Sequence, residues 1–390
     1  YALTVGNTKE NINTDLKTIN VSLCHCGIQP HYSNQDGFVE IKEKDTTRRL
    51  KGLKSCGSNS ACPVCAAKLS AVRGNQLNEL MQVGRGHGRS YMMIVSTIPH
   101  RPGEELEITL NQVIDMSRYI FNQRKWKEFK QITQCRFVHG GLENMVSFKN
   151  GKVDWHPHKN YLLDFDISTD QIIKELGLKT ELDLRMYVSR LLSGLGQKFL
   201  DLRKISKELL QPFAEQDQKT KRIYVKAGVA CSLEFSDDYI AKWGLDAEMT
   251  AGIYKDGSFR ESFHPFLLLD FINKDNKEVN DIQRYQCVKA FQEFVLASKG
   301  KWWFYFAKGA VAYYNEQYGC EIKVKKDEEE LLSLEDEGEN IYTLNNEEWE
   351  IFEPTSKKIG EALSKPTRQE VLEYIFEEIE RNRIKYLSTA

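Results

Sequence analysis

Residues 137–165 read FVHGGLENMVSFKNGKVDWHPHKNYLLDF, and they contain the clearest structural signal in the chain. At its centre is Asn150-Gly151, a pair that strongly favours a two-residue β-hairpin turn between two strands. A two-residue turn fixes the register of the strands, so Glu143 is predicted to face His158. Residues that face each other in this way have Cβ atoms about 5 Å apart. The sequence therefore predicts a long antiparallel hairpin in which each side chain has a known neighbour.

One face of this hairpin collects side chains that can bind a metal ion. Because side chains alternate across a strand, His156, His158 and Asn160 share one face. With Glu143 they supply two imidazoles, an amide and a carboxylate, which suit a divalent cation and leave room for substrate oxygens. A His-x-His pair on a strand is more often a surface pair, and a bulge at Pro157 would change the register. Both the surface pair and the metal site stay open on this pattern alone.

A second set of candidate ligands is a group of cysteines. Cys56, Cys62 and Cys65 lie in a segment rich in Gly, Ser and Asn. The Cys62-x2-Cys65 spacing lets a tight turn present two thiolates to one tetrahedral Zn²⁺. We choose Cys26 as the fourth ligand, with Cys24 as the alternative. Four thiolates leave no position for water, so the predicted zinc site is structural. Free thiols of a reduced protein are the alternative to zinc.

The charge of the chain is unevenly distributed. The 390 residues hold 54 Lys+Arg and 56 Asp+Glu. Residues 326–390 hold 8 basic and 18 acidic groups, a net charge of −10, which leaves residues 1–325 at +8. A basic body with an acidic tail makes nucleic acid a candidate partner. A solvated acidic tail on an ordinary enzyme is the alternative, and charge alone favours it.

Composition and length define the broad class of protein. Hydrophobic residues make up 41% and charged residues 28%, as in globular proteins. No run approaches about 18 consecutive apolar residues, which argues against a transmembrane helix. There is no signal-peptide pattern at the first residues, and the nine cysteines are odd in number. We therefore expect a cytoplasmic protein. No phosphate-binding G-x-x-x-x-G-K-[ST] motif occurs, so a nucleotide-hydrolysing motor is not expected.

Hydrophobic periodicity predicts the elements around the hairpin. Helices are predicted over residues 66–81, 104–132, 180–209 and 281–298, and from residue 367 onward. A buried strand is predicted over residues 91–98, and an acidic loop over residues 327–339. We expect an α+β fold in which an antiparallel sheet has flanking helices. The predicted regions are a zinc-binding N-terminal region (1–84), a central domain (85–315) and an acidic C-terminal region that ends in a helix (316–390).

A short segment outside the hairpin contains a candidate nucleophile. Residues 236–244 read SDDYIAKWG, in which Ser236 is a good N-cap and Gly244 can end a helix. Tyr239 and Lys242 are three residues apart and would share one face of that helix. A phenol with a pKa near 10 is a poor nucleophile at neutral pH unless its anion is favoured, for example by a nearby ammonium group. On the residues alone, a packing aromatic is the favoured interpretation of Tyr239.

Several of these segments resemble one family. Residues 53–68, which contain three of the cysteines, resemble the zinc segment of bacterial rolling-circle replication initiator (Rep) proteins. Residues 155–163, WHPHKNYLL, look like their HUH motif (His–hydrophobic–His), and residues 239–244, YIAKWG, resemble their catalytic-tyrosine motif. Residues 94–100 resemble the strand that precedes the HUH motif in the family, and residues 264–269 and 297–301 also look like family segments. The matches follow the family's order from about residue 26 to residue 310, and this order makes the resemblance specific.

The resemblance implies an HUH endonuclease of plasmids or phages, with an RRM-like palm in the central domain. It implies that Mg²⁺ or Mn²⁺ is held at Glu143, His158 and Asn160, where His156 could take part. The family pattern has histidine at the position of Asn160, and an amide oxygen can still bind a hard cation. The family also favours an apolar residue at the position of Lys159.

The resemblance further implies a two-step transesterification of DNA. Tyr239 would attack the scissile phosphate and leave a 5′-phosphotyrosine and a free 3′-OH that primes a host polymerase. Lys242 would contact phosphate. A carboxylate would activate the water of the second cleavage, with Asp237, Asp238 and Glu234 as candidates.

The partners implied are origin DNA, single-stranded or supercoiled, with a host helicase and polymerase, and no membrane. A transposase or mobilisation relaxase of the same superfamily is one alternative. A non-catalytic origin-binding relative is the other, and the joint presence of Glu143, His158 and Tyr239 favours an enzyme over it.

Overall fold

The computed structural model describes residues 38–44, 47–53, 55–58, 61–203, 223–225, 229–232, 262–273, 276–301, 304–324, 338–354 and 356–389. The chain divides into two compact units, one of residues 1–69 and 325–390, the other of residues 70–324. The described residues near both ends of the chain therefore belong to the same unit.

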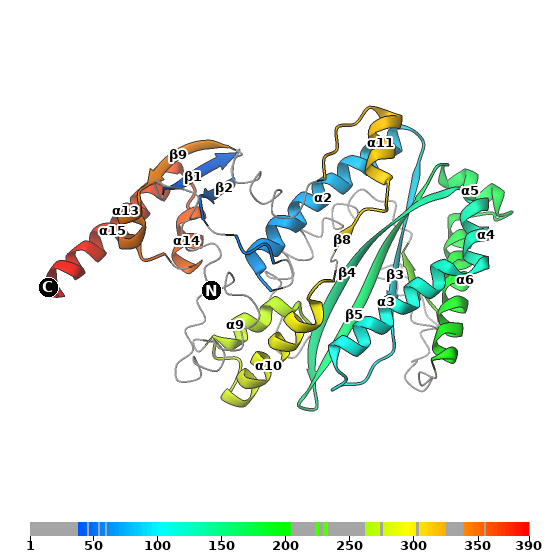
Figure 1. The fold of residues 1–390 in the computed structure, drawn as a ribbon, viewed down its shortest axis with the longest axis horizontal. Helices are drawn as coiled ribbons and strands as arrows, with labels where there is room; N and C mark the ends of the chain where they lie inside the picture. The colour runs from blue at the N-terminus through cyan, green and yellow to red at the C-terminus, as the bar shows by residue number, and fades with distance from the viewer. Residues whose placement is uncertain are drawn as a thin grey trace. The chain divides into compact units, whose positions relative to one another are not determined.

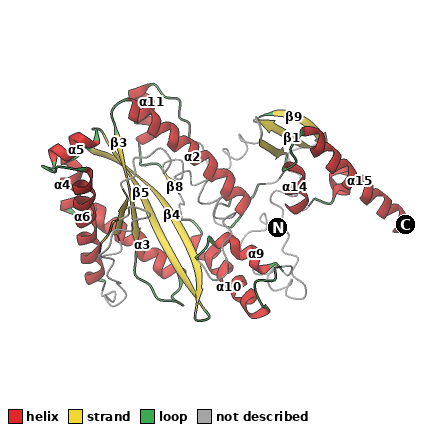
Figure 2. Ribbon diagram, turned by 180° about the vertical axis from the view of Figure 1, so that it is seen from behind, coloured by secondary structure: helices red, strands yellow, loops and turns green. Residues whose placement is uncertain are grey.

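The larger unit contains a six-stranded antiparallel sheet in the order β6-β7-β3-β5-β4-β8. Figure 1 labels β3, β4, β5 and β8 of this sheet. The strands are β3 (Ser90–Thr97), β4 (Cys135–Lys149), β5 (Lys152–Phe165), β6 (Ile223–Val225), β7 (Val229–Ser232) and β8 (Phe304–Tyr305). Strands β4 and β5 run side by side as the predicted long hairpin (Figure 2). Glu143 pairs with His158, so the predicted register is confirmed. Asn150 and Gly151 have φ values of 52° and 73°, the positive values that a type I′ turn requires.

Pro157 does not disturb this register. It pairs with Asn144 on β4, and the pairing of β4 with β5 shifts only near Cys135. On the other side, the pairing of β3 with β5 ends at Thr97 and His158. Pro157 thus lies just beyond the last pair with β3, where a missing backbone N–H is tolerated.

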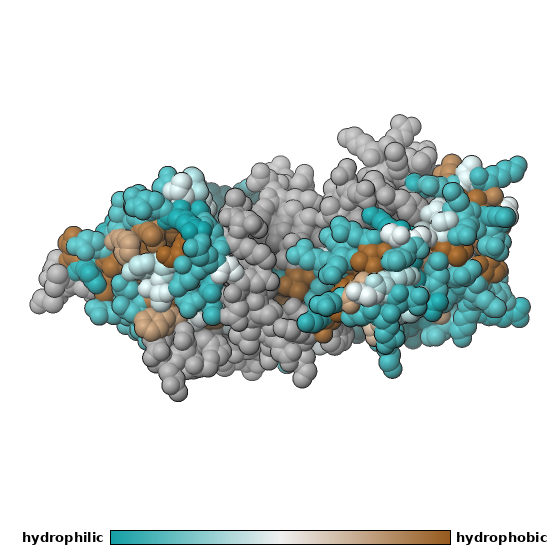
Figure 3. Space-filling model, turned by 90° about the horizontal axis from the view of Figure 1, so that it is seen from above, coloured by the Kyte–Doolittle hydropathy of each residue, from teal (hydrophilic) through white to brown (hydrophobic). Residues whose placement is uncertain are grey.

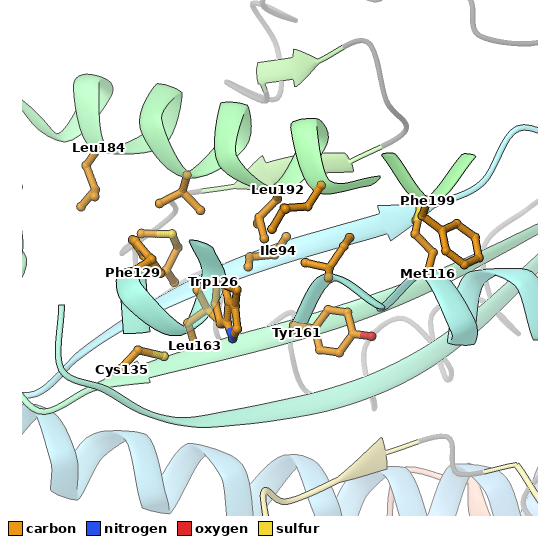
Figure 4. Close-up of a cluster of buried hydrophobic side chains, with 14 of the residues drawn as sticks. Ile94, Met116, Trp126, Phe129, Cys135, Tyr161, Leu163, Leu184, Leu192 and Phe199 are labelled. Carbon is orange, nitrogen blue, oxygen red and sulfur yellow. The ribbon is translucent and has the colours of Figure 1, made fainter. Parts of the chain in front are cut away.

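Helices of the larger unit cover one face of the sheet. They are α3 (Leu106–Asn122), α4 (Arg124–Ile132), α5 (Thr169–Glu175) and α6 (Glu181–Leu202). Figure 4 shows Leu184 and Leu192 of α6 pointing toward the sheet, where Ile94 and Leu163 belong to the same buried cluster. Tyr161 lies in this cluster, on the face opposite the histidines, as the alternation of β5 predicts.

The prediction of a single helix over residues 104–132 is wrong, because the helix is interrupted at Gln123. That residue has an extended backbone, with φ −72° and ψ 147°, and it separates α3 from α4. Ile120 and Trp126 are both buried, although residues six apart point about 120° apart on a straight helix. The break turns α4 so that Trp126 and Phe129 also reach the core. The helix predicted over residues 180–209 begins after a capping box formed by Thr180 and Asp183, and it ends at Leu202.

Two further helices, α2 (Pro63–Gly86) and α11 (Ala310–Tyr318), lie on the opposite side of the sheet (Figures 1 and 2). Leu80 of α2 and Tyr314 of α11 share a core with Leu162 of β5. Leu162 is an even number of residues from His156 and His158, so its side chain points to the same face of β5. These helices therefore cover one end of the face that carries the two histidines. The helix predicted over residues 66–81 is confirmed and is longer at both ends.

Near the hairpin turn, the sheet packs against α9 (Leu268–Ile272) and α10 (Asp281–Ser298), and the predicted bounds of α10 are confirmed. Phe294 of α10 stacks on Trp155 of β5, with ring centroids 6.4 Å apart. His264 is buried before α9, and its Nδ1 accepts a hydrogen bond from the backbone N–H of Phe266 at 3.2 Å.

A buried ion-pair network lies at the other end of β5. Nε and Nη2 of Arg89 donate to Oδ1 of Asp164 at 2.9 and 2.7 Å. The hydroxyl of Tyr314 donates to Oδ2 of Asp164 at 3.0 Å, and it lies 2.6 Å from the hydroxyl of Tyr91. Burial and the adjacent Asp164 raise the pKa of Tyr314, so its hydroxyl keeps the proton that it donates. The network joins β3, β5 and α11.

The smaller unit contains a three-stranded antiparallel sheet in the order β2-β1-β9. Its elements are β1 (Val39–Lys44), β2 (Thr47–Lys51), β9 (Glu339–Leu344), α13 (Asn346–Phe352), α14 (Ser356–Leu363) and α15 (Arg368–Thr389). Ile41 of β1, Leu344 of β9 and Val371 of α15 share its core. A helix was predicted from residue 367 onward, and a capping box of Thr367 and Glu370 opens α15 there. Strand β9 was not predicted, and it begins at Glu339, where the acidic loop was expected to end.

Hydrophobic side chains are mainly inside the two units. The face drawn in Figure 3 is largely hydrophilic over the coloured residues, and hydrophobic residues occur there in small groups. Among the described helices, none has both the length and the apolar content needed to cross a membrane.

The predicted fold class is confirmed at the level of an α+β protein with antiparallel sheets and flanking helices.

Candidate metal centres

Strand β5 carries a row of polar side chains on one face. Asp154, His156, His158 and Asn160 alternate with residues that point to the opposite face. The residues that pair with them on β4 include Ser147 and Glu143. This row, together with Glu143 on β4, contains every hairpin residue that the sequence predicted as a metal ligand.

Glu143, His158 and Asn160 form the first candidate centre. The Nδ2 of Asn160 donates a hydrogen bond to Oε2 of Glu143 at 3.2 Å, and Glu143 pairs with His158. The other amide atom, Oδ1 of Asn160, is buried and has no hydrogen-bond partner among the described residues. Leaving a buried acceptor unpaired costs about 1–3 kcal/mol. A bound cation would supply the missing partner, so these residues fit a hard divalent ion.

Gly141 pairs with Asn160 across the hairpin. Because glycine has no side chain, β4 places nothing opposite the amide. The carboxylate of Glu143 can only accept a hydrogen bond, so it fixes which end of the amide is NH₂ and leaves Oδ1 as the free ligand atom.

Lys159 is the second position at which the sequence departs from the family pattern. Its side chain points to the face of β5 opposite His158 and Asn160. Its Nζ lies 5.4 Å from the ring centre of Tyr161 and 5.7 Å from that of Tyr305. Burial lowers the pKa of Lys159 to about 8. The two aromatic rings stabilise the ammonium group in a place that otherwise suits an apolar residue.

A second group consists of His100, Asp154 and His156. Nε2 of His156 lies 3.1 Å from Oδ2 of Asp154, and Nε2 of His100 lies 3.4 Å from Oδ1. The two imidazole rings are 4.5 Å apart in a T-shaped arrangement. Nζ of Lys149 lies 2.6 Å from Oδ2 of Asp154. Burial, with His100 as the next cause, lowers the pKa of His156 to about 4, so this imidazole is neutral at neutral pH.

The sequence did not predict His100 or Asp154 as ligands. Asp154 could have been found, because it precedes His156 by two residues and so shares its face. His100 follows β3 in a loop, and the register of the hairpin says nothing about its position.

The cysteine cluster has the geometry of a metal site at three of its four predicted ligands. Cys56, Cys62 and Cys65 come together near the start of α2, and none of them is in a disulfide. The sulfur atoms of Cys56 and Cys65 are 3.7 Å apart. Zinc–sulfur bonds of about 2.3 Å in a tetrahedron put the sulfur atoms about 3.8 Å apart. The N–H of Cys65 donates to Sγ of Cys62 at 3.5 Å, which stabilises a thiolate there.

The other predicted site residues lie outside the described residues. They are Cys26 with its alternative Cys24, the nucleophile Tyr239, its neighbour Lys242, and the carboxylates Glu234, Asp237 and Asp238.

Comparison with known proteins adds no relative: no family model, no curated protein and no solved structure matches the chain.

Proposed function

We propose that the chain is a metal-dependent DNA nicking and joining enzyme that initiates rolling-circle replication. The observation that carries the proposal is the buried, unpartnered Oδ1 of Asn160 beside Glu143, on a face shared with His158. One carboxylate, one imidazole and one amide oxygen form a donor set for Mg²⁺ or Mn²⁺ that leaves coordination positions for phosphate oxygens.

Glu143, His158 and Asn160 would hold this ion, which supplies Lewis-acid polarisation of the scissile phosphate when bound. Glu143 contributes the single formal negative charge of the three side chains. A divalent ion therefore leaves the centre with a net positive charge, which favours an anionic phosphate. The hydrogen bond from Asn160 to Glu143 orients both ligands before the substrate arrives.

We interpret the six-stranded sheet as the RRM-like palm of an HUH endonuclease. The candidate ligands lie on a central hairpin, and α3 and α6 cover the opposite face. The net charge of +8 in residues 1–325 supports DNA as the substrate. The cysteine cluster would be a structural zinc site with Cys26 as its fourth ligand.

We assign the attack to Tyr239, on the resemblance of residues 239–244 to the catalytic-tyrosine motif of the Rep family. Its phenol oxygen would form a bond to phosphorus while the bond from phosphorus to the 3′-oxygen breaks. The phenol proton ends on the departing 3′-oxygen, and the 5′-phosphate remains on the tyrosine. Lys242 would contact the phosphate, and Asp237 or Asp238 would activate water for the second cleavage.

The test is a comparison of wild type with Tyr239→Phe and a matched control, Tyr285→Phe, which changes an exposed tyrosine of α10. Each protein is incubated with Mn²⁺ and a supercoiled plasmid that carries the DNA flanking the chain's own coding sequence. Wild type and the control should give open circles with protein attached to the 5′ end, and Tyr239→Phe should give neither product.

Mass spectrometry of the adduct identifies the attacking residue. A 5′-linked nucleotide on Tyr239 supports the assignment, whereas an adduct on another tyrosine refutes it. His158→Ala should also stop cleavage, and excess Mn²⁺ should partly restore it, because that variant loses metal affinity rather than the nucleophile. Wild type that binds this DNA without cleaving it would favour the non-catalytic alternative.

A further inference from the structure

In the group formed by His100, Asp154 and His156, the contact between His100 and Asp154 is not explained by a hydrogen bond. Nδ1 of His100 lies 3.0 Å from the carbonyl oxygen of Ile98, and a carbonyl oxygen can only accept. Nδ1 therefore carries the proton, and a neutral ring has its lone pair on Nε2. That nitrogen faces Oδ1 of Asp154 at 3.4 Å.

Oδ1 of Asp154 is buried and has no hydrogen-bond partner among the residues that the structure describes. A lone pair on nitrogen and a carboxylate oxygen repel each other at this distance unless a positive charge lies between them. Nε2 of His156 faces the second oxygen of the same carboxylate at 3.1 Å. One buried carboxylate thus lies between two imidazole nitrogens.

The spacing of these atoms matches that of ligands around one metal ion. Bonds of about 2.1 Å from a metal to nitrogen and oxygen put neighbouring ligand atoms about 3.0 Å apart in an octahedron and about 3.4 Å apart in a tetrahedron. The observed nitrogen–oxygen distances are 3.1 and 3.4 Å. The three residues each offer one ligand atom, and these atoms lie within 4.8 Å of one another.

The cation that now contacts Asp154 can be displaced. Lys149 reaches Oδ2 of Asp154 from the end of β4, and its side chain is 55% exposed, against 2% for Asp154. An exposed ammonium group contributes little to such a pair, because it is stabilised by water when it leaves. Lys149 also contacts Oδ2, and Oδ1 stays without a hydrogen bond.

We propose that His100, Asp154 and His156 bind a second divalent ion, of the class Mn²⁺, Co²⁺ or Zn²⁺, separate from the ion at Glu143, His158 and Asn160. Two imidazoles and one carboxylate favour transition metals over Mg²⁺ and leave positions for water or an anionic oxygen ligand. Along β5, His156 and His158 are two residues apart, or about 6.6 Å, so the two ions occupy adjacent positions on one face.

The test counts bound Mn²⁺ on the full chain, from the electron paramagnetic resonance signal of the ion that stays free. Wild type should bind two Mn²⁺ ions. His158→Ala should bind one, and His100→Gln and Asp154→Asn should each weaken the other site at least tenfold, since each loses a direct ligand. His87→Gln, which changes an exposed histidine between α2 and β3, is the matched control and should bind two.

Two variants keep the test valid if one of them folds poorly, and urea unfolding verifies that each is folded. If His100→Gln and Asp154→Asn both bind Mn²⁺ as wild type does, the proposal is overturned. A proton between His100 and Asp154 would then account for their contact. A single ion that is lost in His158→Ala and also in His100→Gln would mean one shared centre and would overturn the proposal as well. Binding is measured without DNA, so a chain that fails to nick DNA leaves this result unaffected.

Discussion

The substitution Asp164→Asn tests how much the buried ion pair between Arg89 and Asp164 stabilises the end of β5. It keeps the shape of the side chain and removes the charge that faces Arg89. The side chains of Arg89 and Asp164 are 1% and 0% exposed, so water cannot replace the partner charge that the guanidinium group loses, and Asp166 remains as its second carboxylate partner. Neutralising one partner of a buried ion pair costs about 3–5 kcal/mol of the free energy of unfolding. We expect a loss of stability in this range.

Asp166→Asn is the matched control, because Asp166 contacts the same Arg89 and also Arg136. Its side chain is 18% exposed, so water can replace part of what the substitution removes. Pairs that water can reach contribute about 1 kcal/mol or less. The two substitutions should therefore differ by at least about 2 kcal/mol, although both change one carboxylate beside one arginine.

The assay is native-state hydrogen exchange of the β5 amides, which reports the stability of the larger unit separately from that of the smaller one. Equal losses in the two variants would refute the reasoning from burial. Loss below about 0.5 kcal/mol in Asp164→Asn would show that Asp166, the second carboxylate beside Arg89, compensates for the missing charge. The double substitution of Arg89→Met with Asp164→Leu should recover part of the stability, because it removes both buried charges together.

Three further predictions concern the metal centres and the pH dependence of stability. Asn160→His should preserve or raise nicking, more with Mn²⁺ than with Mg²⁺, because imidazole binds transition metals better than an amide does; lost nicking would show that residue 160 has another role. Elemental analysis should find one Zn²⁺ per chain that resists a weak chelator, and its retention in Cys26→Ser would make Cys24 or His25 the fourth ligand. Burial lowers the pKa of His264 from 6.5 to about 4, so between these pH values the unfolded chain binds a proton that the folded chain does not. Stability should fall by up to about 1.4 kcal/mol per pH unit as the pH drops through this window, and an unchanged urea-unfolding profile in His264→Asn would contradict this.

The parts of the fold that could be predicted depend on local geometry. Asn150-Gly151 determines a turn, the turn determines a register, and the register pairs Glu143 with His158. Capping boxes at Thr180 and Thr367 likewise mark helix starts through contacts within three residues. Each of these signals is contained in a short piece of sequence.

The parts that could not be predicted depend on contacts between distant residues. The pairing of β1 with β9 joins Val39 to Leu344, and no short-range pattern indicates it. His100 reaches Asp154 because β3 pairs with β5 and the chain continues past Thr97, which pairs with His158, toward Asp154. The break at Gln123 arises because the core requires both Ile120 and Trp126 on its side.

The arrangement of the smaller unit has a consequence for synthesis of the chain on the ribosome. Strand β1 ends at Lys44 and its partner β9 begins at Glu339, with the whole contiguous larger unit translated between them. At about 5–20 residues per second, β1 waits about 15–60 s for β9 to emerge. During that time β1 has one unpaired edge, which can pair with another nascent chain. A premature stop codon between residues 325 and 338 would leave the larger unit complete in sequence and deprive β1 of its partner.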